Sequence, residues 1–560
     1  MAEDRPQPSS TTEISRRKIL SASGAALALA GGMGLSMPAP AQAGSSSAAS
    51  AIGNAQRRRR KAAQLRERAA RAYLKGRLPR QRTNGDDQRY SDRRASFFKT
   101  LPQNDLGEVD QHAYRALLKA LRTKRQSDFN AIPLSLVSER KLANPQGAYA
   151  FELTGLDGQA TRIPAAPRFD GATQAAEMGE VYWQALTRDV AFDDYDSDSL
   201  VQTALSDLNN FSAKVGPTDN GQITAGTLFR GETPGDLIGP YISQFLWLDV
   251  PYGPSTIIQK YDRPVAGIDF GTAYADWLAI QRGAVIGQNT FDIDKVYISN
   301  NRALGEYVHR DYSFQAYLNA ALIMFSFGPD ALAASNPYLD IDNQGAFVTF
   351  GPPAIGDLVT KAARLALTGA WYQKWLVHRR LRPEVFAGRI ENQRIGNKDY
   401  GINAEIMNSV AVSETVADFS TALLPLAFPE GSPTHPSYPA GHACVAGACA
   451  TILKAFFNED FEIPAPMVAT PSGDTLVPWG GAPLTLGNEI NKLANNISIG
   501  RDAAGVHYRS DGIDGLTGGE QQALGMLQDY SRTYNEDFGG FTLTRFDGSP
   551  VLVRNGRIIG

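Results

Sequence analysis

The sequence predicts a mainly α-helical fold with minor β-hairpins at its edges. Two observations support this class. From about residue 173 onward, apolar residues recur at helical spacing, whereas alternating patterns are confined to residues 133–170 and 541–559. The chain also has no internal repeat of fixed short period. Helical periodicity is clearest over residues 175–190, 197–210, 271–283, 311–325, 356–378, 403–424, 441–457 and 517–530.

The remaining elements are assigned from local signals. Residues 57–82 are strongly basic with the spacing of an amphipathic helix, which we interpret as a solvated face or an arm that packs on another subunit; an anion- or membrane-surface patch is the alternative. Residues 95–126 should form a loop and then a helix. Residues 133–170 combine alternating apolar residues with Pro and Gly turns, so short strands are expected. Residues 541–559 predict a β-hairpin with Gly-Ser-Pro and Asn-Gly turns.

Length and charge narrow the function classes. A chain of 560 residues with 43% hydrophobic content can bury an ample core. The net charge of -3 argues against general nucleic-acid binding, because such binding usually needs a basic excess. The 2 cysteines, Cys444 and Cys449, exclude a disulfide-rich scaffold and are expected to be small buried residues.

The N-terminus resembles a twin-arginine export signal. Arg16 and Arg17 form an arginine pair, a weakly apolar run follows over residues 22–37, and residues 41–43 read Ala-Gln-Ala, the small-x-small pattern of a cleavage site. The apolar run is shorter than the about 20 residues of a membrane span, and no other span is evident. We therefore expect export to the periplasm or the extracellular space. A disordered tail with a chance arginine pair is the alternative.

The chain is expected to divide into an export signal (residues 1–43), a basic linker and N-terminal arm (44–95) and a helical domain (96–560). Within that domain, three short stretches each centre on a basic residue or a histidine. They cover residues 374–383, 435–442 and 500–511. The chain has only 6 histidines, and three of them fall in the last two stretches. Fixed cations with histidines suit a tetrahedral oxyanion such as phosphate or vanadate, so we predict one shared pocket.

The first stretch contributes Lys374 and Arg382. They are eight residues apart, about two helical turns, so both could point from a similar face into one cavity. Arg382 precedes Pro383, where a helix stops. The alternative is two surface residues of a basic stretch that also contains Arg379 and Arg380.

The second stretch leads into a helix. Pro436 and Pro439 keep the chain extended, and Gly441 lets the backbone approach a ligand closely. A helix starting near His442 would direct free N–H groups and its positive dipole end at an anion. His442 would then be placed to donate or accept a proton. A loop histidine that caps the helix is the alternative.

The third stretch contains Arg501, His507 and Asp511. Arg501 could present a two-pronged guanidinium group to oxyanion oxygens. On a helix, His507 and Asp511 would share a face, and a carboxylate bonded to one ring nitrogen makes the other the better ligand or nucleophile. An ordinary helix with one ion pair is the alternative.

Taken in order, Lys…Arg-Pro, Pro-x-Gly-His and Arg…Gly-Val-His…Asp resemble the vanadium-dependent haloperoxidases, which share their helical bundles with type 2 phosphatidic-acid phosphatases and bacterial acid phosphatases. The spacing of eight in the first stretch is similar to the algal and cyanobacterial bromoperoxidase branch. So are three further motifs: His435-Pro-Ser-Tyr-Pro, Gly505-Val-His-Tyr-Arg-Ser-Asp-Gly-Ile and Leu101-Pro-Gln-Asn-Asp-Leu-Gly-Glu-Val-Asp. The resemblance covers most of the chain after about Gln56.

This resemblance implies a vanadate cofactor and assigns its holders. His507 would be the axial ligand bonded to vanadium, oriented by Asp511. The backbone N–H of Gly441 and three cations would neutralise the equatorial oxygens. The three cations are Lys374, Arg382 and Arg501.

The resemblance also assigns the chemistry. His442 would handle protons as the acid–base residue, and Lys374 would polarise the peroxide. His435 matches a position that is histidine in bromoperoxidases and phenylalanine in fungal chloroperoxidases, so it is expected to bear on halide choice. The implied reaction is oxidation of bromide or iodide by hydrogen peroxide, giving hypohalous acid that halogenates a small organic acceptor.

One position departs from the family pattern. Ala440 stands where the family usually has serine, and a lost hydrogen bond to a charged oxyanion costs roughly 1.5–3 kcal/mol. We expect a working pocket with altered affinity or halide preference. Two alternatives remain open: an acid phosphatase with His507 as nucleophile and His442 as leaving-group acid, and a non-catalytic exported protein that binds an oxyanion or forms a surface coat.

Two further expectations concern partners. Asp340, Asp342 and Asn343 could present oxygens to a hard cation such as calcium, although acidic loops are usually only solvated. The resemblance also implies a large symmetric homo-oligomer, such as a dodecamer.

Overall fold

The computed structural model describes residues 46–560, so the expected export signal lies outside the described residues. The described residues divide into two units, with the boundary between Gln64 and Leu65. Helix α1 (Ser46–Lys75) contains the basic run, and its residues 57–61 are exposed. Among the described residues, no helix combines the length and hydropathy of a membrane span. The boundary expected at residue 96 stays a prediction.

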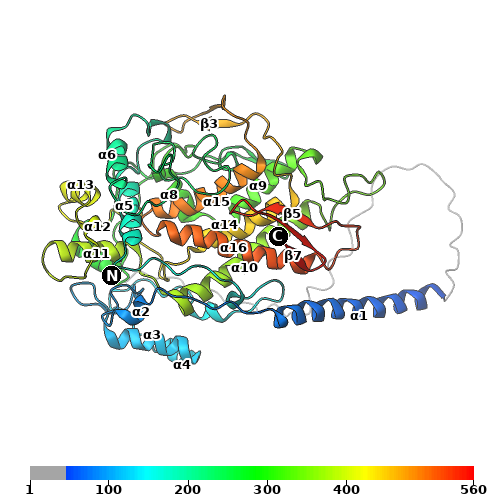
Figure 1. The fold of residues 1–560 in the computed structure, drawn as a ribbon, viewed down its shortest axis with the longest axis horizontal. Helices are drawn as coiled ribbons and strands as arrows, with labels where there is room; N and C mark the ends of the chain where they lie inside the picture. The colour runs from blue at the N-terminus through cyan, green and yellow to red at the C-terminus, as the bar shows by residue number, and fades with distance from the viewer. Residues whose placement is uncertain (1–45) are drawn as a thin grey trace, which may run out of the picture. The chain divides into compact units, whose positions relative to one another are not determined.

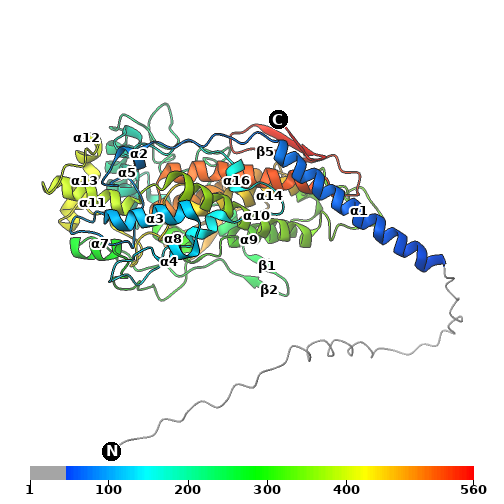
Figure 2. The same cartoon turned by 90° about the horizontal axis from the view of Figure 1, so that it is seen from below.

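Helices dominate the unit Leu65–Gly560 (Figures 1 and 2). They are α2 (Asp86–Arg89), α3 (Gln111–Thr123), α4 (Gln126–Asn130), α5 (Ala172–Leu186), α6 (Ser199–Leu208), α7 (Tyr274–Gln281), α8 (Asn301–Arg310), α9 (Gln315–Ser326), α10 (Pro352–Tyr372), α11 (Pro383–Arg394), α12 (Ala404–Met407), α13 (Val410–Phe419), α14 (Gly441–Phe456), α15 (Leu486–Ala503) and α16 (Arg509–Tyr530). The short 3₁₀ helices are η1 (Pro145–Tyr149), η2 (Gly158–Ala160), η3 (Phe192–Asp194), η4 (Gln244–Leu246) and η5 (Pro329–Ala331), and the segment η6 (Gln373–His378) is a π-helix.

The strands form three small antiparallel sheets. They are β1 (Val250–Tyr252) with β2 (Ser255–Ile257), β3 (Met467–Ala469) with β4 (Leu476–Pro478), and β5 (Phe541–Thr544), β6 (Pro550–Arg554) and β7 (Arg557–Ile559) in that order. The last sheet confirms the hairpin expected near the C-terminus, and Asn555 and Gly556 both adopt the positive φ that its tight turn requires. The mainly helical class is confirmed.

Helix α14 is the centre of the larger hydrophobic core. It contacts α10, α15 and α16, and α10, α14 and α16 lie side by side in both Figure 1 and Figure 2. Every residue of α14 is buried except His442. Cys444 and Cys449 lie on this helix as free buried thiols, which confirms the expectation for both. A helix buried on all sides holds its first turn in a fixed position, and that turn borders the site.

Glycines bring α14 and α16 into backbone contact. A Cβ added to Gly447 would lie 2.1 Å from the carbonyl oxygen of Leu516, and one added to Gly519 would lie 2.0 Å from that of Cys444. A larger residue would therefore push the two backbones apart. This packing aligns the N-terminal ends of both helices.

A second hydrophobic core contains residues of α3, α5, α6, α11, α12 and α13. Trp371, near the end of α10, packs against both cores. Trp375 in η6 and Tyr508 before α16 belong to the second core, whereas Ala440 before α14 belongs to the first. The segments that hold the predicted site residues therefore lie where the two cores meet.

Two segments differ from the sequence-based expectation. Residues 133–170 contain no strand but include η1 and η2, and their backbone hydrogen bonds go to single residues elsewhere, such as Ser135 to Thr100. Alternation alone does not form a sheet when no neighbouring strand is present. The helix expected over residues 403–424 is divided into α12 and α13, because the Ser409 hydroxyl accepts from the backbone N–H of Val412 and starts a new helix.

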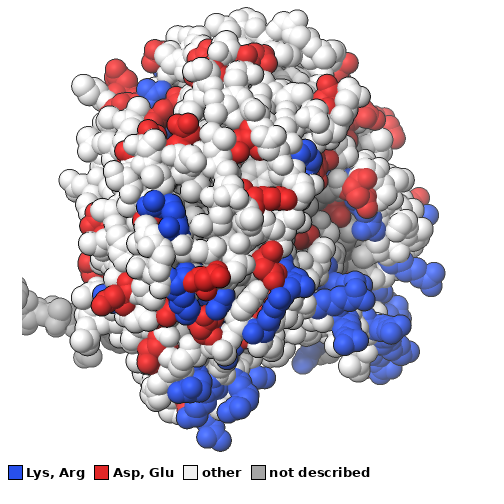
Figure 3. All heavy atoms as spheres, turned by 60° about the vertical axis from the view of Figure 1, so that its left-hand side comes forward, with Lys and Arg blue, Asp and Glu red and all other residues white. Residues whose placement is uncertain are grey.

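Charge on the face shown in Figure 3 is unevenly distributed. Acidic side chains are scattered over its upper and middle part, whereas basic side chains gather at the bottom and lower right.

Candidate active site

Lys374 lies in the π-helical segment η6, not on a regular extension of α10. Its Nζ atom is fully buried and donates to the carbonyl oxygens of Pro436 (2.8 Å) and Ser437 (2.7 Å). Arg379 then takes a left-handed conformation with φ 47°, which ends the helix. Lys374 and Arg382 therefore do not share one helix face, and the prediction from their spacing was wrong in this detail.

Arg382 reaches the same loop from the start of the next helix. It is the residue before α11, with Pro383 in the first turn. Its guanidinium donates to the carbonyl oxygens of His435 (2.9 Å) and Val506 (2.7 Å) and lies 2.9 Å from Nε2 of His507. The two cations thus converge on residues 435–437 although they come from different elements.

His507 precedes α16, so it does not share a helix face with Asp511 as expected. Asp511 lies in the first turn of α16 and folds its carboxylate back to Nδ1 of His507 at 2.8 Å. A guanidinium can only donate, so the contact with Arg382 makes Nε2 of His507 an acceptor. Nδ1 then carries the proton and donates it to Asp511, which leaves the Nε2 lone pair directed away from the carboxylate.

Arg501 is near the end of α15 and lines the same cavity. Its Nη1 donates to the carbonyl oxygen of Val308 at 2.6 Å, and its guanidinium lies over the ring of Phe428. The Nε of Arg501 is buried without a hydrogen-bond partner among the described residues. This buried donor is free to bond an acceptor that enters the cavity.

The site residues enclose a cavity of about 110 Å³. Its polar wall includes the three predicted histidines and one of the predicted cations, and the first residue of α14 borders it. The lining residues are Ser313, Leu367, Trp371, Pro433, His435, Gly441, His442, Val445, Arg501 and His507. The amides in the first turn of a helix have no intrahelical partner, so the α14 terminus at Gly441 adds donors to this wall.

The charge of the site is unbalanced. Lys374, Arg382 and Arg501 are buried, and among the described residues none of them forms an ion pair with a carboxylate. Burial lowers the pKa of Lys374 well below its usual value, and nearby Arg382 lowers it further. Burial also lowers the pKa of Arg382 to about 9 and that of Arg501 to about 10. Such clustered like charges favour a bound anion.

His442 is the one residue of α14 that is not fully buried, and its Nε2 lies 2.9 Å from Oδ1 of Asp311. The Asp311 side chain is 3% exposed, whereas that of His442 is 27% exposed. Because a carboxylate holds one ring nitrogen, the other is free to exchange a proton at the cavity. Sequence reasoning missed Asp311, since nothing in its local pattern marks it as a partner 131 residues away.

His435 lines the cavity and packs against Trp371 at 4.8 Å between ring centroids. Its Nδ1 lies 3.0 Å from Nη2 of Arg382 and 3.1 Å from the carbonyl oxygen of Pro436. Burial lowers the pKa of His435 well below the usual value, and Lys374 adds to the effect. A neutral imidazole at the wall suits a role in selecting the ion that enters, although that role stays a prediction.

Ala440 caps α14 without a side-chain hydrogen bond and is fully buried. Its backbone N–H donates to the carbonyl oxygen of Asp511 at 2.8 Å, which connects the starts of α14 and α16.

The acidic loop that was considered as a calcium site is exposed at Asp340 and Asp342. The described part of the chain holds no group of three or more acidic, histidine or cysteine side chains that could bind a metal ion. Calcium therefore stays an untested prediction.

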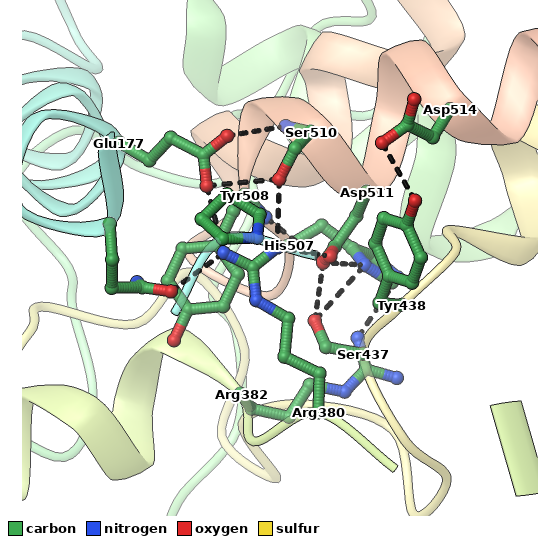
Figure 4. Close-up of polar contacts among 12 residues, drawn as sticks. Glu177, Arg380, Arg382, Ser437, Tyr438, His507, Tyr508, Ser510, Asp511 and Asp514 are labelled. Atoms are coloured by element: carbon green, nitrogen blue, oxygen red, sulfur yellow. Dashed lines mark hydrogen bonds and ion pairs between the residues drawn. The ribbon is translucent and has the colours of Figure 1, made fainter. Parts of the chain in front are cut away.

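A second layer of side chains supports His507 and was also missed (Figure 4). Arg380 donates to Asp511 at 2.8 Å and to Glu177 of α5 at 2.8 Å, and the Ser437 hydroxyl donates to Asp511. The only sequence signal was the basic run that contains Arg380. No local pattern could show that α5, about 200 residues earlier, lies behind the site.

Comparisons with known proteins agree with this geometry. A family model described as "VCPO second helical-bundle domain" matches residues 358–536, which include all three stretches. The vanadium-dependent bromoperoxidase of Corallina pilulifera is 34% identical over 543 residues, covering 82% of this chain and 91% of that protein. A vanadium-dependent bromoperoxidase of Ascophyllum nodosum is 34% identical over 484 residues, covering 82% of this chain and 86% of that protein.

One solved structure is similar over most of its length. The homohexameric second vanadate-dependent bromoperoxidase of Ascophyllum nodosum superposes with a TM-score of 0.85 at 28% identity, covering 90% of this chain and 91% of that one. In each of these comparisons the similarity extends over most of both chains, so it is not limited to one shared domain. The chain therefore belongs to the vanadium-dependent bromoperoxidase family.

Proposed function

We propose that the protein oxidises bromide or iodide with hydrogen peroxide by means of bound vanadate, releasing hypohalous acid that halogenates small organic acceptors. The observation that carries this proposal is a group of three buried cations that have no carboxylate partner within residues 46–560, set beside an acceptor nitrogen of His507. These residues fit vanadate, which needs positive charge around its oxygens and one nitrogen ligand. When bound, vanadate supplies a Lewis acid that activates peroxide without changing its own oxidation state.

The protein's residues would then act through charge and proton transfer. His507 would hold the metal through Nε2, with Arg382 turning from that nitrogen to the anion. Lys374, Arg382, Arg501 and the Gly441 amide would stabilise negative charge on oxygen, in a site already arranged for it. His442 would move protons to and from the reacting oxygens, with Asp311 keeping its ring in place.

The first test is bromination of a dye or diketone by protein stripped of bound anions, with peroxide and bromide, before and after addition of orthovanadate. We expect activity that depends on vanadate and falls with excess phosphate. Hydrolysis of an aryl phosphate without bromide oxidation would replace the proposal with a phosphatase that uses His507 as nucleophile. Failure to bind vanadate at all would support a non-catalytic oxyanion-binding protein.

We also propose assembly and export. The homohexameric relative supports a homo-oligomer for this chain, and light scattering of the purified protein would give its mass.

Arg16 and Arg17 support export through the twin-arginine route. Fusion of residues 1–43 to a reporter should export it, and Arg16→Lys with Arg17→Lys should retain it inside the cell.

A further inference from the structure

Four cationic side chains lie close to the site, but one of them is neutralised within the protein. Arg380 is 4% exposed, and its guanidinium contacts two carboxylates: Oδ1 of Asp511 at 2.8 Å and Oε2 of Glu177 at 2.8 Å. It also donates to Gln174 of α5 at 2.7 Å and stacks over the Tyr508 ring at 4.0 Å. Its charge is therefore not available to an anion in the cavity, and its function must differ from that of Lys374, Arg382 and Arg501.

Arg380 completes the set of donors around Asp511. Oδ2 of Asp511 accepts from Nδ1 of His507 (2.8 Å), from the Ser437 hydroxyl and from the backbone N–H of Tyr508 (3.2 Å). Oδ1 accepts from Arg380 on the opposite side. With both oxygens held, the carboxylate cannot rotate, and the imidazole that donates to it is fixed in one plane and one tautomer.

Glu177 in turn fixes Arg380. Its Oε2 accepts from Arg380, and its Oε1 accepts from the backbone N–H of Ser510 at 2.8 Å. Figure 4 shows the resulting chain of side chains from Glu177 through Arg380 and Asp511 to His507. Helix α5 belongs to the second hydrophobic core, so this chain connects that core to the imidazole.

We propose that Arg380, anchored by Glu177, is a positioning residue that sets the orientation and tautomer of His507 and thereby the affinity for vanadate. This inference rests on the proposed function, in which His507 ligates vanadium. Partners that orient a metal ligand from behind typically change metal affinity when they are removed, even though they never touch the metal.

The chain offers a matched control for the loss of a buried ion pair. Arg509 and Glu180 form a second pair between the start of α16 and α5, with each side chain 4% exposed. Glu180 is three residues from Glu177, but its pair has no bond to Asp511 or His507. Glu180→Gln therefore perturbs the same two elements without touching the positioning chain.

The experiment compares Arg380→Met, Arg380→Lys and Glu177→Gln with Glu180→Gln and the natural protein. Vanadate affinity is measured by equilibrium dialysis, folding by thermal denaturation, and the hydrogen bond by the low-field Nδ1–H proton resonance of His507, assigned by its loss in His507→Ala. We expect Arg380→Met to weaken vanadate binding about 10- to 100-fold and to shift or broaden that resonance.

Arg380→Lys should restore part of the affinity, Glu177→Gln should weaken it less than Arg380→Met, and Glu180→Gln should lower stability with vanadate affinity unchanged. Equal affinity in all folded variants, with the His507 resonance unmoved, would overturn the proposal. If the natural protein fails to bind vanadate, the proposed function is wrong, and the resonance alone then decides whether Arg380 positions His507.

Discussion

Lys374, Arg382 and Arg501 show how single residues prepare a site for an anion. Each donates hydrogen bonds to backbone carbonyl oxygens, which do not neutralise its charge. Burial lowers the pKa of Lys374, and the positive charge of Arg382 lowers this pKa further. Arg380, by contrast, has carboxylate partners on both sides, and the pKa of its guanidinium is raised. A cation with only carbonyl partners keeps a charge that can attract an anion. A cation between two carboxylates, such as Arg380, holds neighbouring side chains in place instead.

Ala440→Ser is expected to lower the dissociation constant for vanadate about tenfold or more, since one hydrogen bond to a charged oxyanion contributes roughly 1.5–3 kcal/mol. Equilibrium dialysis measures the affinity. Position 440 also precedes α14, and serine there can cap the helix and stabilise the fold by about 1 kcal/mol. Higher thermal stability with unchanged affinity would mean that the hydroxyl caps the helix and does not reach the anion.

His442→Ala should lower the bromide oxidation rate by about 10²- to 10⁴-fold, the usual contribution of a general acid–base group. Vanadate affinity should change far less, because His442 is partly exposed, whereas the three cations are buried. Asp311→Asn should cause a smaller loss of the same kind by freeing the imidazole to rotate. Steady-state kinetics with saturating vanadate checks both variants. Loss of vanadate binding in each would contradict the assigned role.

At the scale of elements, the sequence predicted helices best where the helical spacing of apolar residues continues over several turns. The helices over residues 175–190 and 441–457 match α5 and α14 closely. The break between α12 and α13 depends on one serine cap, and the end of α10 depends on a π-helical turn at Lys374. Such features arise from contacts that a periodicity pattern does not contain.

The same distinction applies to the site. Residues with a short motif, such as Gly441 with His442 or His507 with Asp511, could be recognised from the sequence. Asp311 and Glu177 could not, because each becomes a partner only when distant helices pack together. The structure brings all the predicted residues to one place, while their roles in catalysis stay predictions.

Gly519→Ala should destabilise the contact between α14 and α16. Its Cβ would lie 2.0 Å from the carbonyl oxygen of Cys444 and 2.7 Å from the backbone nitrogen of Ala448, and backbone atoms cannot yield as a flexible side chain does. Overpacking of this kind lowers the free energy of unfolding by about 1–3 kcal/mol or more. Chemical denaturation measures the change.

The control is Gly356→Ala in α10, where the nearest atom to the added Cβ is a Leu318 methyl at 3.8 Å. Alanine favours a helix over glycine by about 1 kcal/mol, so this variant should be as stable as the natural protein or more so. A Gly519→Ala protein equal in stability to Gly356→Ala would show that α14 and α16 can separate without penalty.

For the whole molecule, the buried charges predict that anions stabilise the fold. Phosphate at 100 times its dissociation constant should raise the free energy of unfolding of the anion-stripped protein by about 2.7 kcal/mol. Because the pKa of Lys374 is lowered in the fold, its protonated form opposes folding below its ordinary pKa, and an anion relieves that penalty. The gain in thermal midpoint should be larger at pH 7 than at pH 10. Sodium chloride at matched ionic strength is the control, and an equal gain from it would contradict the prediction.

The meeting of two hydrophobic cores at the site has a consequence for folding kinetics. In the cavity wall, Val445 belongs to one core and Trp371 packs against both, so the wall is complete only after both cores have formed and docked. An intermediate with a single core therefore has no binding site, and an anion cannot template early folding. Anion binding should slow unfolding while the refolding rate stays unchanged, so cofactor uptake reports the last step of assembly.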